Sequence, residues 1–340
     1  MTLGTGWCFG GPDVDAHTGS MYGYVEKLNI EDAHIRLDLT TKSKYDFNKI
    51  QSALAVYPDG TRIDISDRIN EGQFLDWTAS SDDLSLYLIR MQGPVFEVKR
   101  PAPGGEGYML DPFSKRAINQ YTGEFDRVFN GSLNRHVRAI YHDSYEYQAD
   151  WTHRLYEVFK ERRGYDLRLY LPELAREEGE TSRRVIADYR QTMAELHEAY
   201  IAKTAQWAKA NDLLFRNQGH GSPANWLDIY AQADIPETET FGATPFKIPG
   251  LTREEAFINN DRPNRFVLKF ASSAAHVTGK PLVSSETNTW LREHFRVSLS
   301  HSKPELDQLF LSGINHIFYH GIAYSPKEAE WPGWQFYAST

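Results

Sequence analysis

Acidic residues follow three strand-like apolar runs of this 340-residue chain. The three acid-bearing segments are residues 142–146, 235–239 and 284–288. A strand that runs into a loop presents its last side chains at the edge of a sheet or at the mouth of a barrel. Two carboxyl groups on either side of a bound sugar can protonate a leaving oxygen and activate a water molecule. The three segments therefore predict an enzyme that hydrolyses glycosidic bonds.

Glu146 and Glu286 are the predicted catalytic pair. Glu146 lies between Tyr145 and Tyr147, and aromatic walls that exclude water favour the protonated carboxyl that a general acid requires. Glu286 ends an apolar run and precedes hydroxyl and amide side chains, which can hold a general base in place. In the alternative interpretation, each glutamate is an ordinary acid at the start of the element that follows.

Three other residues are predicted to contact the substrate. Asp143 lies three positions before Glu146, and Trp290 follows Glu286 in a polar and aromatic cluster. His220 lies between two glycines, and small neighbours let a ligand approach the ring and the backbone closely. His220 is otherwise interpreted as a packed loop histidine.

Glu237 and Glu239 are predicted to hold a cation. They are two positions apart in an extended segment, so both side chains lie on the same side. Like charges at that separation repel unless a cation or a positive substrate group lies between them, and oxygen ligands favour calcium or magnesium over zinc. The alternative is a solvated face, where paired glutamates are common.

Composition excludes several classes of function. The net charge of −9 argues against a nucleic-acid partner, because phosphate binding requires a basic surface. Cys8 is the only cysteine, which excludes an intramolecular disulfide and a cysteine-based zinc site. The sequence has no apolar run of about 18 residues and no signal-peptide pattern, so we expect a soluble chain with no membrane partner. Its 13% aromatic content suits either a carbohydrate site or an aromatic-rich core.

The spacing of apolar residues predicts an α/β protein. Residues 21–100 alternate with a period of two around Pro58-Asp-Gly60, a hairpin signal, which predicts an antiparallel β module. Beyond 101–105, strand-like and helical runs alternate, which requires a mostly parallel sheet. The predicted strands are residues 137–141, 213–215, 227–233, 282–284 and 316–319, and the predicted helices are residues 151–159, 181–210, 266–277 and 305–311.

The position of the acids favours a closed barrel over an open sheet, because a barrel gathers all strand ends around one mouth. We therefore predict a (β/α)8-type TIM barrel, incomplete at the C-terminus because only seven strands can be counted. Its predicted parts are a first barrel strand and loop over 1–20, an inserted antiparallel β module over 21–100, and the remainder of the barrel over 101–340.

The chain resembles the α-L-rhamnosidases of glycoside hydrolase family 106. The resemblance covers most of the chain and rests on several short motifs that are each weak alone. These motifs are Gly4-Thr-Gly-Trp-Cys-Phe-Gly-Gly-Pro12, Gly107-Tyr-Met-Leu-Asp-Pro112, Asp143-Ser-Tyr-Glu146, Arg216-Asn-Gln-Gly-His220, Asp234-Ile-Pro-Glu-Thr-Glu239, Ser284-Ser-Glu286, Tyr319-His-Gly321 and Trp331-Pro-Gly-Trp-Gln-Phe-Tyr337.

The resemblance implies an inverting hydrolase that removes terminal α-L-rhamnose from oligosaccharides or polysaccharides, with Glu146 and Glu286 as general acid and base. Which glutamate has which role stays open. It adds Tyr319 and His320 to the substrate-binding residues, and a calcium ion (Ca2+) near the sugar that Glu237 or Glu239 helps to hold. Inversion requires the two carboxyl groups to be about 6.5 to 9.5 Å apart.

Members of that family are usually much longer, so we expect this chain to be a fragment of a longer protein that is periplasmic or secreted. Two other functions stay open: a sugar-binding homologue without activity on the same barrel, and a glycosidase for a different sugar.

Overall fold

The computed structural model describes residue 3 and residues 8–40, 47–176, 178–241, 265–289, 299–321, 325–331 and 333. The chain forms two compact units. The first, here called the parallel-sheet unit, contains residues 134–145 and 208–340, and the second, here called the mixed unit, contains residues 2–133 and 146–207.

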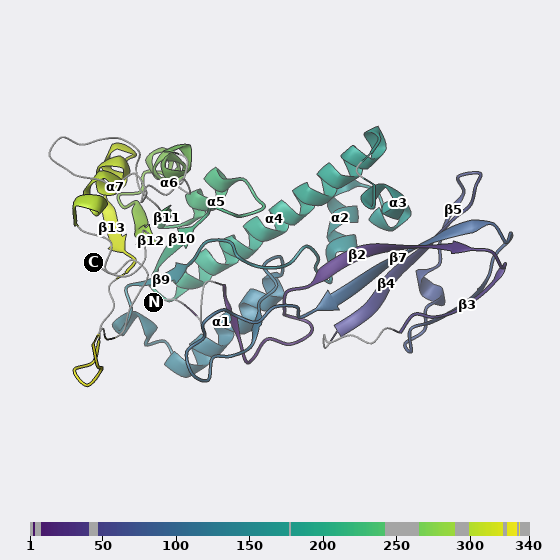
Figure 1. Ribbon diagram of the computed structural model, residues 1–340, viewed down its shortest axis with the longest axis horizontal. Coiled ribbons are helices and arrows are strands. Elements are labelled where there is room, and N and C mark those ends of the chain that lie inside the picture. Colours follow the sequence, from purple (N-terminus) through teal and green to yellow (C-terminus); the bar gives the residue numbers. More distant parts are fainter. Residues whose placement is uncertain are drawn as a thin grey trace. The chain divides into compact units, whose positions relative to one another are not determined.

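The parallel-sheet unit is built on five parallel strands in the order β13-β12-β11-β10-β9. Three helices alternate with these strands along the chain, and α6 and α7 contact β11 and β12 (Figure 1). The strands are β9 (Ala139–His142), β10 (Leu214–Gln218), β11 (Ile235–Phe241), β12 (Ser284–Thr289) and β13 (His316–Tyr319), and the helices are α5 (Trp226–Gln232), α6 (Arg265–Thr278) and α7 (Leu299–Leu311).

The helices of this unit bury one apolar stripe. Small and aliphatic residues of α6, including Leu268, Ala271 and Ala275, recur at three- and four-residue steps, as a helix that packs on a sheet requires. They pack with Leu309 of α7 and with Val283, which precedes β12. The core of this unit therefore lies between the helices and one face of the sheet.

The mixed unit contains the antiparallel strands and four helices. β2, β7, β4 and β5 form one sheet, β3 and β6 form a second, and β1 and β8 form a third. The strands are β1 (Gly10–Gly11), β2 (Tyr22–Ile30), β3 (His34–Asp38), β4 (Phe47–Val56), β5 (Arg62–Asp64), β6 (Phe74–Thr78), β7 (Leu84–Gly93) and β8 (Tyr108–Met109); the helices are α1 (Lys115–Phe129), α2 (Leu155–Arg163), α3 (Leu171–Leu174) and α4 (Glu180–Ala210), of which the last three residues fall in the parallel-sheet unit. Three 3-10 turns cover Ser66–Arg68, Leu133–Arg135 and Leu167–Tyr170.

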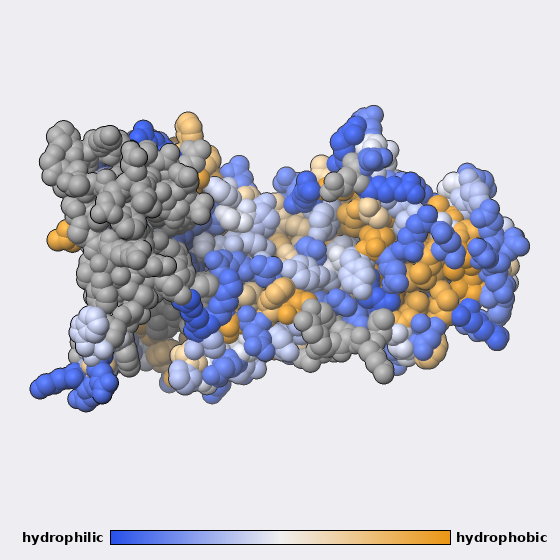
Figure 2. Space-filling model, in the orientation of Figure 1, coloured by the Kyte–Doolittle hydropathy of each residue, from blue (hydrophilic) through white to orange (hydrophobic). Residues whose placement is uncertain are grey.

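The predicted Pro58-Asp-Gly60 hairpin is confirmed. β4 and β5 pair antiparallel on either side of it, and Gly60 has a φ of 88°, a conformation that glycine adopts without a Cβ clash. β3 and β6 alternate between exposed and more buried residues, whereas β7 is buried along most of its length, and the core of this module includes Leu86 and Leu88 of β7. On the face shown in Figure 2, apolar side chains gather over this module among polar ones.

The predicted (β/α)8 barrel is wrong for the residues that the structure describes. They form a half-barrel of five parallel strands together with antiparallel sheets, and no complete ring of eight strands. The strand predicted at 227–233 is also wrong, because Trp226–Gln232 is the helix α5, capped by the Asn225 side chain, which accepts from the Leu227 amide at 3.0 Å. In this run Asp228 and Gln232 alternate with apolar residues as they would in a strand, and a run of this length does not distinguish a strand from a helix.

None of the helices in the described ranges has the length and apolar character needed to cross a membrane.

Replacing Leu88 by alanine is expected to destabilise the mixed unit by about 2 to 5 kcal/mol, because the side chain is 0% exposed and its removal leaves a cavity. Urea unfolding followed by circular dichroism measures the change. Leu169→Ala is the matched control, since Leu169 is 37% exposed; equal destabilisation by the two variants would contradict the core assignment.

Candidate active site

One face of the parallel sheet carries most of its functional groups. Side chains two residues apart on a strand share a face, and the register places Gln218 beside Glu237 and Glu239 beside Glu286 on neighbouring strands. We call this the polar face. Its members include Tyr141 of β9, Arg216 and Gln218 of β10, Glu237 and Glu239 of β11, Ser284 and Glu286 of β12, and Phe318 of β13.

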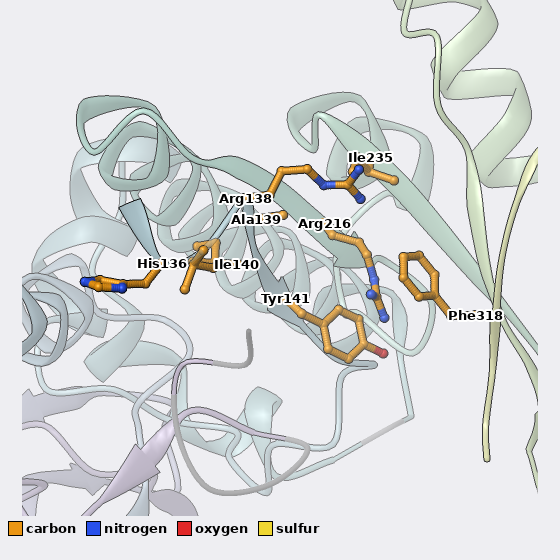
Figure 3. A pocket seen from close by; sticks show the side chains of 9 residues that line it. His136, Arg138, Ala139, Ile140, Tyr141, Arg216, Ile235 and Phe318 are labelled. Atoms are coloured by element: carbon orange, nitrogen blue, oxygen red, sulfur yellow. The ribbon is translucent and has the colours of Figure 1, made fainter. Parts of the chain in front are cut away.

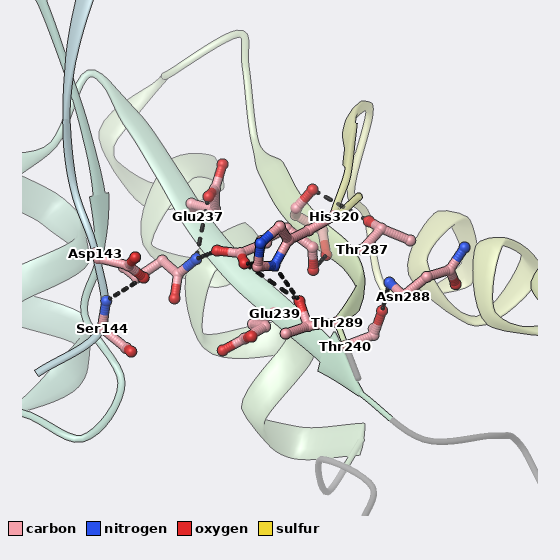
Figure 4. A network of polar contacts seen from close by, with 12 residues as sticks. Asp143, Ser144, Glu237, Glu239, Thr240, Thr287, Asn288, Thr289 and His320 are labelled. Carbon is pink, nitrogen blue, oxygen red and sulfur yellow. Dashed lines mark hydrogen bonds and ion pairs between the residues drawn. The ribbon is translucent and has the colours of Figure 1, made fainter. Parts of the chain in front are cut away.

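Glu286 lies among hydrogen-bond donors. Its carboxylate accepts from the Tyr141 hydroxyl at 2.8 Å, from the Gln218 amide at 2.7 Å and from the Thr289 hydroxyl at 3.2 Å. It also pairs with the His320 ring (Figure 4). Burial alone would raise the pKa of Glu286, but His320, Tyr141 and Gln218 outweigh burial and lower it to about 2. Glu286 is therefore ionised at neutral pH.

Asp143 has the opposite shift. It follows β9 directly, and its Oδ1 lies 3.0 Å from the Tyr141 hydroxyl and 2.8 Å from the Ser144 amide, which donates to it. Burial and the negative charge of Glu286 raise the pKa of Asp143 to about 8. The Tyr141 hydroxyl thus lies between two carboxyl groups: that of Asp143, which favours the protonated form, and that of Glu286, which is ionised.

His320 follows β13 and acts as the partner of Glu286. The hydrogen bond and the charge of Glu286 raise the pKa of His320, because both favour the protonated ring. A charged imidazolium beside a carboxylate leaves this part of the site with little net charge.

Arg216 and Glu237 form a second ion pair on the polar face. The Arg216 Nε lies 2.7 Å from Glu237 Oε2 and its Nη2 lies 3.0 Å from Oε1. Glu237 is 0% exposed and also accepts from the Ser284 hydroxyl at 2.5 Å. Burial raises the pKa of Glu237, although Arg216 and Ser284 act in the opposite direction.

Aromatic rings lie on both sides of the Arg216 guanidinium. Its central carbon lies 3.9 Å from the ring centre of Tyr141 and 3.8 Å from that of Phe318, so both rings make cation–π contacts. The same three side chains line a cavity of about 320 Å³, together with His136 and Arg138 (Figure 3). Tyr141 and Arg216 therefore line this cavity and also contact the carboxylates of Glu286 and Glu237.

A family model of α-L-rhamnosidases, glycoside hydrolase family 106, matches residues 26–339. The chain belongs to this family. A rhamnosidase from Novosphingobium sp. PP1Y has a similar structure, with a TM-score of 0.60 and 24% sequence identity over 78% of this chain and 26% of that chain. At that identity, the likeness shows the fold alone. A Formosa agariphila protein named "Putative beta-glucuronidase" is 29% identical over 292 residues, which are 82% of this chain and 23% of that protein.

This α-L-rhamnosidase family chain thus spans about a quarter of the length of the two relatives.

Several of the residues predicted from the sequence lie together in the parallel-sheet unit. Asp143, Glu286 and His320 contact one another directly or through Tyr141. His220 Nε2 lies 3.3 Å from Glu239 Oε2, so this histidine has an acidic partner on the next strand. The substrate-binding role of each of these residues stays a prediction.

Three further predicted residues are Tyr319, Trp290 and Glu146. Tyr319 ends β13 and is 55% exposed, and Trp290 lies outside the described residues. Glu146 belongs to the mixed unit, where its carboxylate pairs with Lys99 at 2.9 Å. The pairing of Glu146 with Glu286 therefore stays a prediction.

The sequence interpretation missed Tyr141, Gln218 and Ser284 as site residues. Each lies two positions before an assigned residue, as in Tyr141-His-Asp143 and Ser284-Ser-Glu286. A period of two puts such pairs on one face of a strand, so the same spacing that drew attention to Glu237 and Glu239 applied to them as well.

The calcium ion that the family resemblance implies does not fit Glu237. Calcium binds six to eight oxygen ligands, whereas both oxygens of this carboxylate contact the cationic Arg216. Glu239, the other predicted ligand, pairs with His220. Among the described residues, no group of three or more His, Cys, Asp or Glu side chains is arranged to hold a metal.

We expect excess EGTA to have no effect on the hydrolysis of an aryl α-L-rhamnoside, because Arg216 supplies the positive charge that a cation would otherwise bring to Glu237. Initial rates with and without the chelator, followed by added calcium, measure this. Loss of activity that calcium restores would contradict the expectation and support the predicted ion.

Replacing Arg216 by methionine is expected to destabilise the protein by about 3 to 5 kcal/mol, because it leaves the Glu237 charge buried and unpaired. The double variant Arg216→Met with Glu237→Gln is expected to recover part of this loss, since it removes both charges. Urea unfolding measures both variants. Arg127→Met, which breaks an exposed ion pair with Glu124, is the control and should cost less than about 1 kcal/mol.

Proposed function

We propose that this chain hydrolyses terminal α-L-rhamnosides with inversion, using Glu286 as the general base. The observation that carries the proposal is the state of Glu286, a buried carboxylate that Tyr141, Gln218 and His320 keep ionised on the polar face. A general base must hold no proton at the pH of the reaction. Membership of the α-L-rhamnosidase family supports the sugar.

Glu286 is held in the state and the position that a base needs. It is ionised, and donors from β9, β10 and the segment after β13 fix both of its oxygens. Such a carboxylate can orient a water molecule and take its proton as the new bond to the sugar forms. Its fixed negative charge also stabilises the positive charge that the sugar ring develops in the transition state.

Glu146 is the proposed general acid, which gives its proton to the leaving oxygen. Because Glu286 is ionised and takes the role of base, Glu146 takes the role of acid in this proposal. The ion pair between Glu146 and Lys99 would have to open first, because a leaving oxygen must take the place of the lysine. An inverting reaction needs room for water between the two carboxyl groups, hence the separation of about 6.5 to 9.5 Å.

A β-glucuronide is the second candidate substrate. The observation that favours it is the relative named "Putative beta-glucuronidase", which matches 82% of this chain. The partner would then be an acidic glycan in place of a rhamnose-containing oligosaccharide or polysaccharide. A periplasmic or secreted location stays a prediction for either substrate.

Replacing Glu286 by glutamine is expected to lower the rate on 4-nitrophenyl α-L-rhamnoside by at least about 100-fold, because the base loses its charge. Release of nitrophenol measures the rate, and NMR of the first product formed shows whether the configuration inverts. Glu146→Gln should cause a comparable loss. Glu71→Gln, a change at an exposed loop position, is the control and should have the wild-type rate.

Three results would contradict parts of this proposal. Release unaffected by Glu286→Gln would reject the site. Hydrolysis of the aryl β-glucuronide alone would reject the sugar. A first product with retained configuration would reject inversion.

A further inference from the structure

We propose that Asp143 is a positioning residue. In the resting site it is protonated and donates a hydrogen bond to Tyr141, so that the Tyr141 hydroxyl proton points at Glu286. The proposal rests on the proposed function, because it concerns how the base is held. It follows from counting the hydrogen atoms that the contacts of the Tyr141 hydroxyl require.

The Tyr141 hydroxyl has one hydrogen atom and three close polar neighbours. Its oxygen lies 3.0 Å from Asp143 Oδ1, 2.8 Å from Glu286 Oε2 and 2.5 Å from Gln218 Nε2. The Gln218 amide nitrogen carries two hydrogen atoms and cannot accept one, so it takes no proton from the tyrosine. The single hydroxyl proton can then satisfy one of the two carboxyl groups.

The orientation of the Gln218 amide is fixed by its other neighbours. The same nitrogen lies 2.7 Å from Glu286 Oε2 and 3.2 Å from Glu237 Oε1. If the amide were turned over, its carbonyl oxygen would face two carboxyl groups and lose these hydrogen bonds. The nitrogen therefore faces the site, where it takes no proton from Tyr141.

A second proton is needed between Tyr141 and one of the carboxyl groups. If Asp143 and Glu286 were both ionised, one of the two contacts would bring lone pairs together in a partly buried site, which is costly. Besides Tyr141, Glu286 receives donors from Gln218, Thr289 and His320, whereas Asp143 receives one, from Ser144, so a proton on Glu286 would weaken more hydrogen bonds than a proton on Asp143. Asp143 is the remaining place for the proton.

The neighbours of Asp143 agree with a neutral acid. Its oxygen can still accept from the Ser144 amide, since a protonated carboxyl keeps acceptor capacity. Burial and Glu286 favour the proton on Asp143. The titratable and charged groups that face Asp143 and Tyr141 from their own and the neighbouring strands are Glu286 on β12, Glu237 and Glu239 on β11, Arg216 on β10, and His320 after β13.

This arrangement ties the base to the protonation state of Asp143. A neutral Asp143 donates to Tyr141, which leaves the tyrosine proton free for Glu286. Because the pKa of Asp143 is raised to about 8, the neutral form is present below that pH and is lost as the pH rises through it. Ionised Asp143 would then compete for the Tyr141 proton and add a negative charge beside Glu286.

The test compares Asp143→Asn with Asp143→Ala in the pH dependence of kcat/KM on the aryl α-L-rhamnoside. Asparagine keeps a donor toward Tyr141 at every pH, so we expect kcat/KM at neutral pH to fall by less than about tenfold. We also expect the basic limb of the profile, set near pH 8 in the wild type, to move up by at least about one pH unit. Alanine supplies no donor and should lower kcat more than asparagine does, with little change in KM.

Infrared difference spectra give a readout that does not depend on activity. The difference spectrum of the wild type minus Asp143→Asn at pH 7 should contain the carbonyl stretch of a protonated carboxyl group. Other buried acids, such as Asp111 with its pKa raised to about 7, are present in both proteins, so their bands cancel. Thermal unfolding checks that both variants fold.

Two outcomes would overturn the proposal. The first is a difference spectrum, wild type minus Asp143→Asn, without the band of a protonated carboxyl group. The second is an Asp143→Asn variant as inactive as Glu286→Gln, which would show that Asp143 must ionise. If the wild type hydrolyses no rhamnoside, the proposed function fails, while the infrared band still decides the state of Asp143.

Discussion

The buried negative charge of Glu286 is the constraint on which the rest of the candidate site depends. A carboxylate out of contact with water is stable only when donors and an opposite charge surround it. Here the donors come from Tyr141 on β9, Gln218 on β10 and His320 after β13. These residues are far apart in the sequence, so the parallel pairing of the strands is what brings them to one carboxylate.

A second buried carboxylate, that of Glu237, is stabilised by the opposite charge of Arg216. The two charges lie on adjacent strands, β10 and β11, and Gln218 reaches both this pair and Glu286. One amide group therefore joins the two charged clusters. Because the Gln218 amide contacts acceptors in both clusters, the changes in stability caused by substitutions in the two clusters should not be additive.

Much of the site could be predicted from the sequence, because strand ends and acids are local patterns. Asp143 directly follows β9 and Glu286 lies in β12, where the apolar runs predicted strands, whereas the run before Glu237 is the helix α5. Tyr141 and Gln218 were missed because their importance comes from partners on other strands, which no local pattern shows. The helix α5 was mistaken for a strand, since its seven residues are too few to show a helical period.

The barrel prediction was wrong for a related reason. Alternating strands and helices require parallel pairing, and β9 to β13 do pair in that way. Closure into a ring depends on how many strands follow and on contacts between the first and the last, neither of which can be read from periodicity. The antiparallel module was easier to predict, because a Pro-Asp-Gly turn acts over a few residues.

The two faces of the parallel sheet carry different kinds of side chain, and this affects which substitutions the sheet can tolerate. The apolar packing lies on the side that α6 and α7 cover, around Leu268 and Leu309. The charged side chains lie on the polar face. Substitutions that redirect recognition on the polar face need not disturb the packing behind it, as long as its buried charges stay matched.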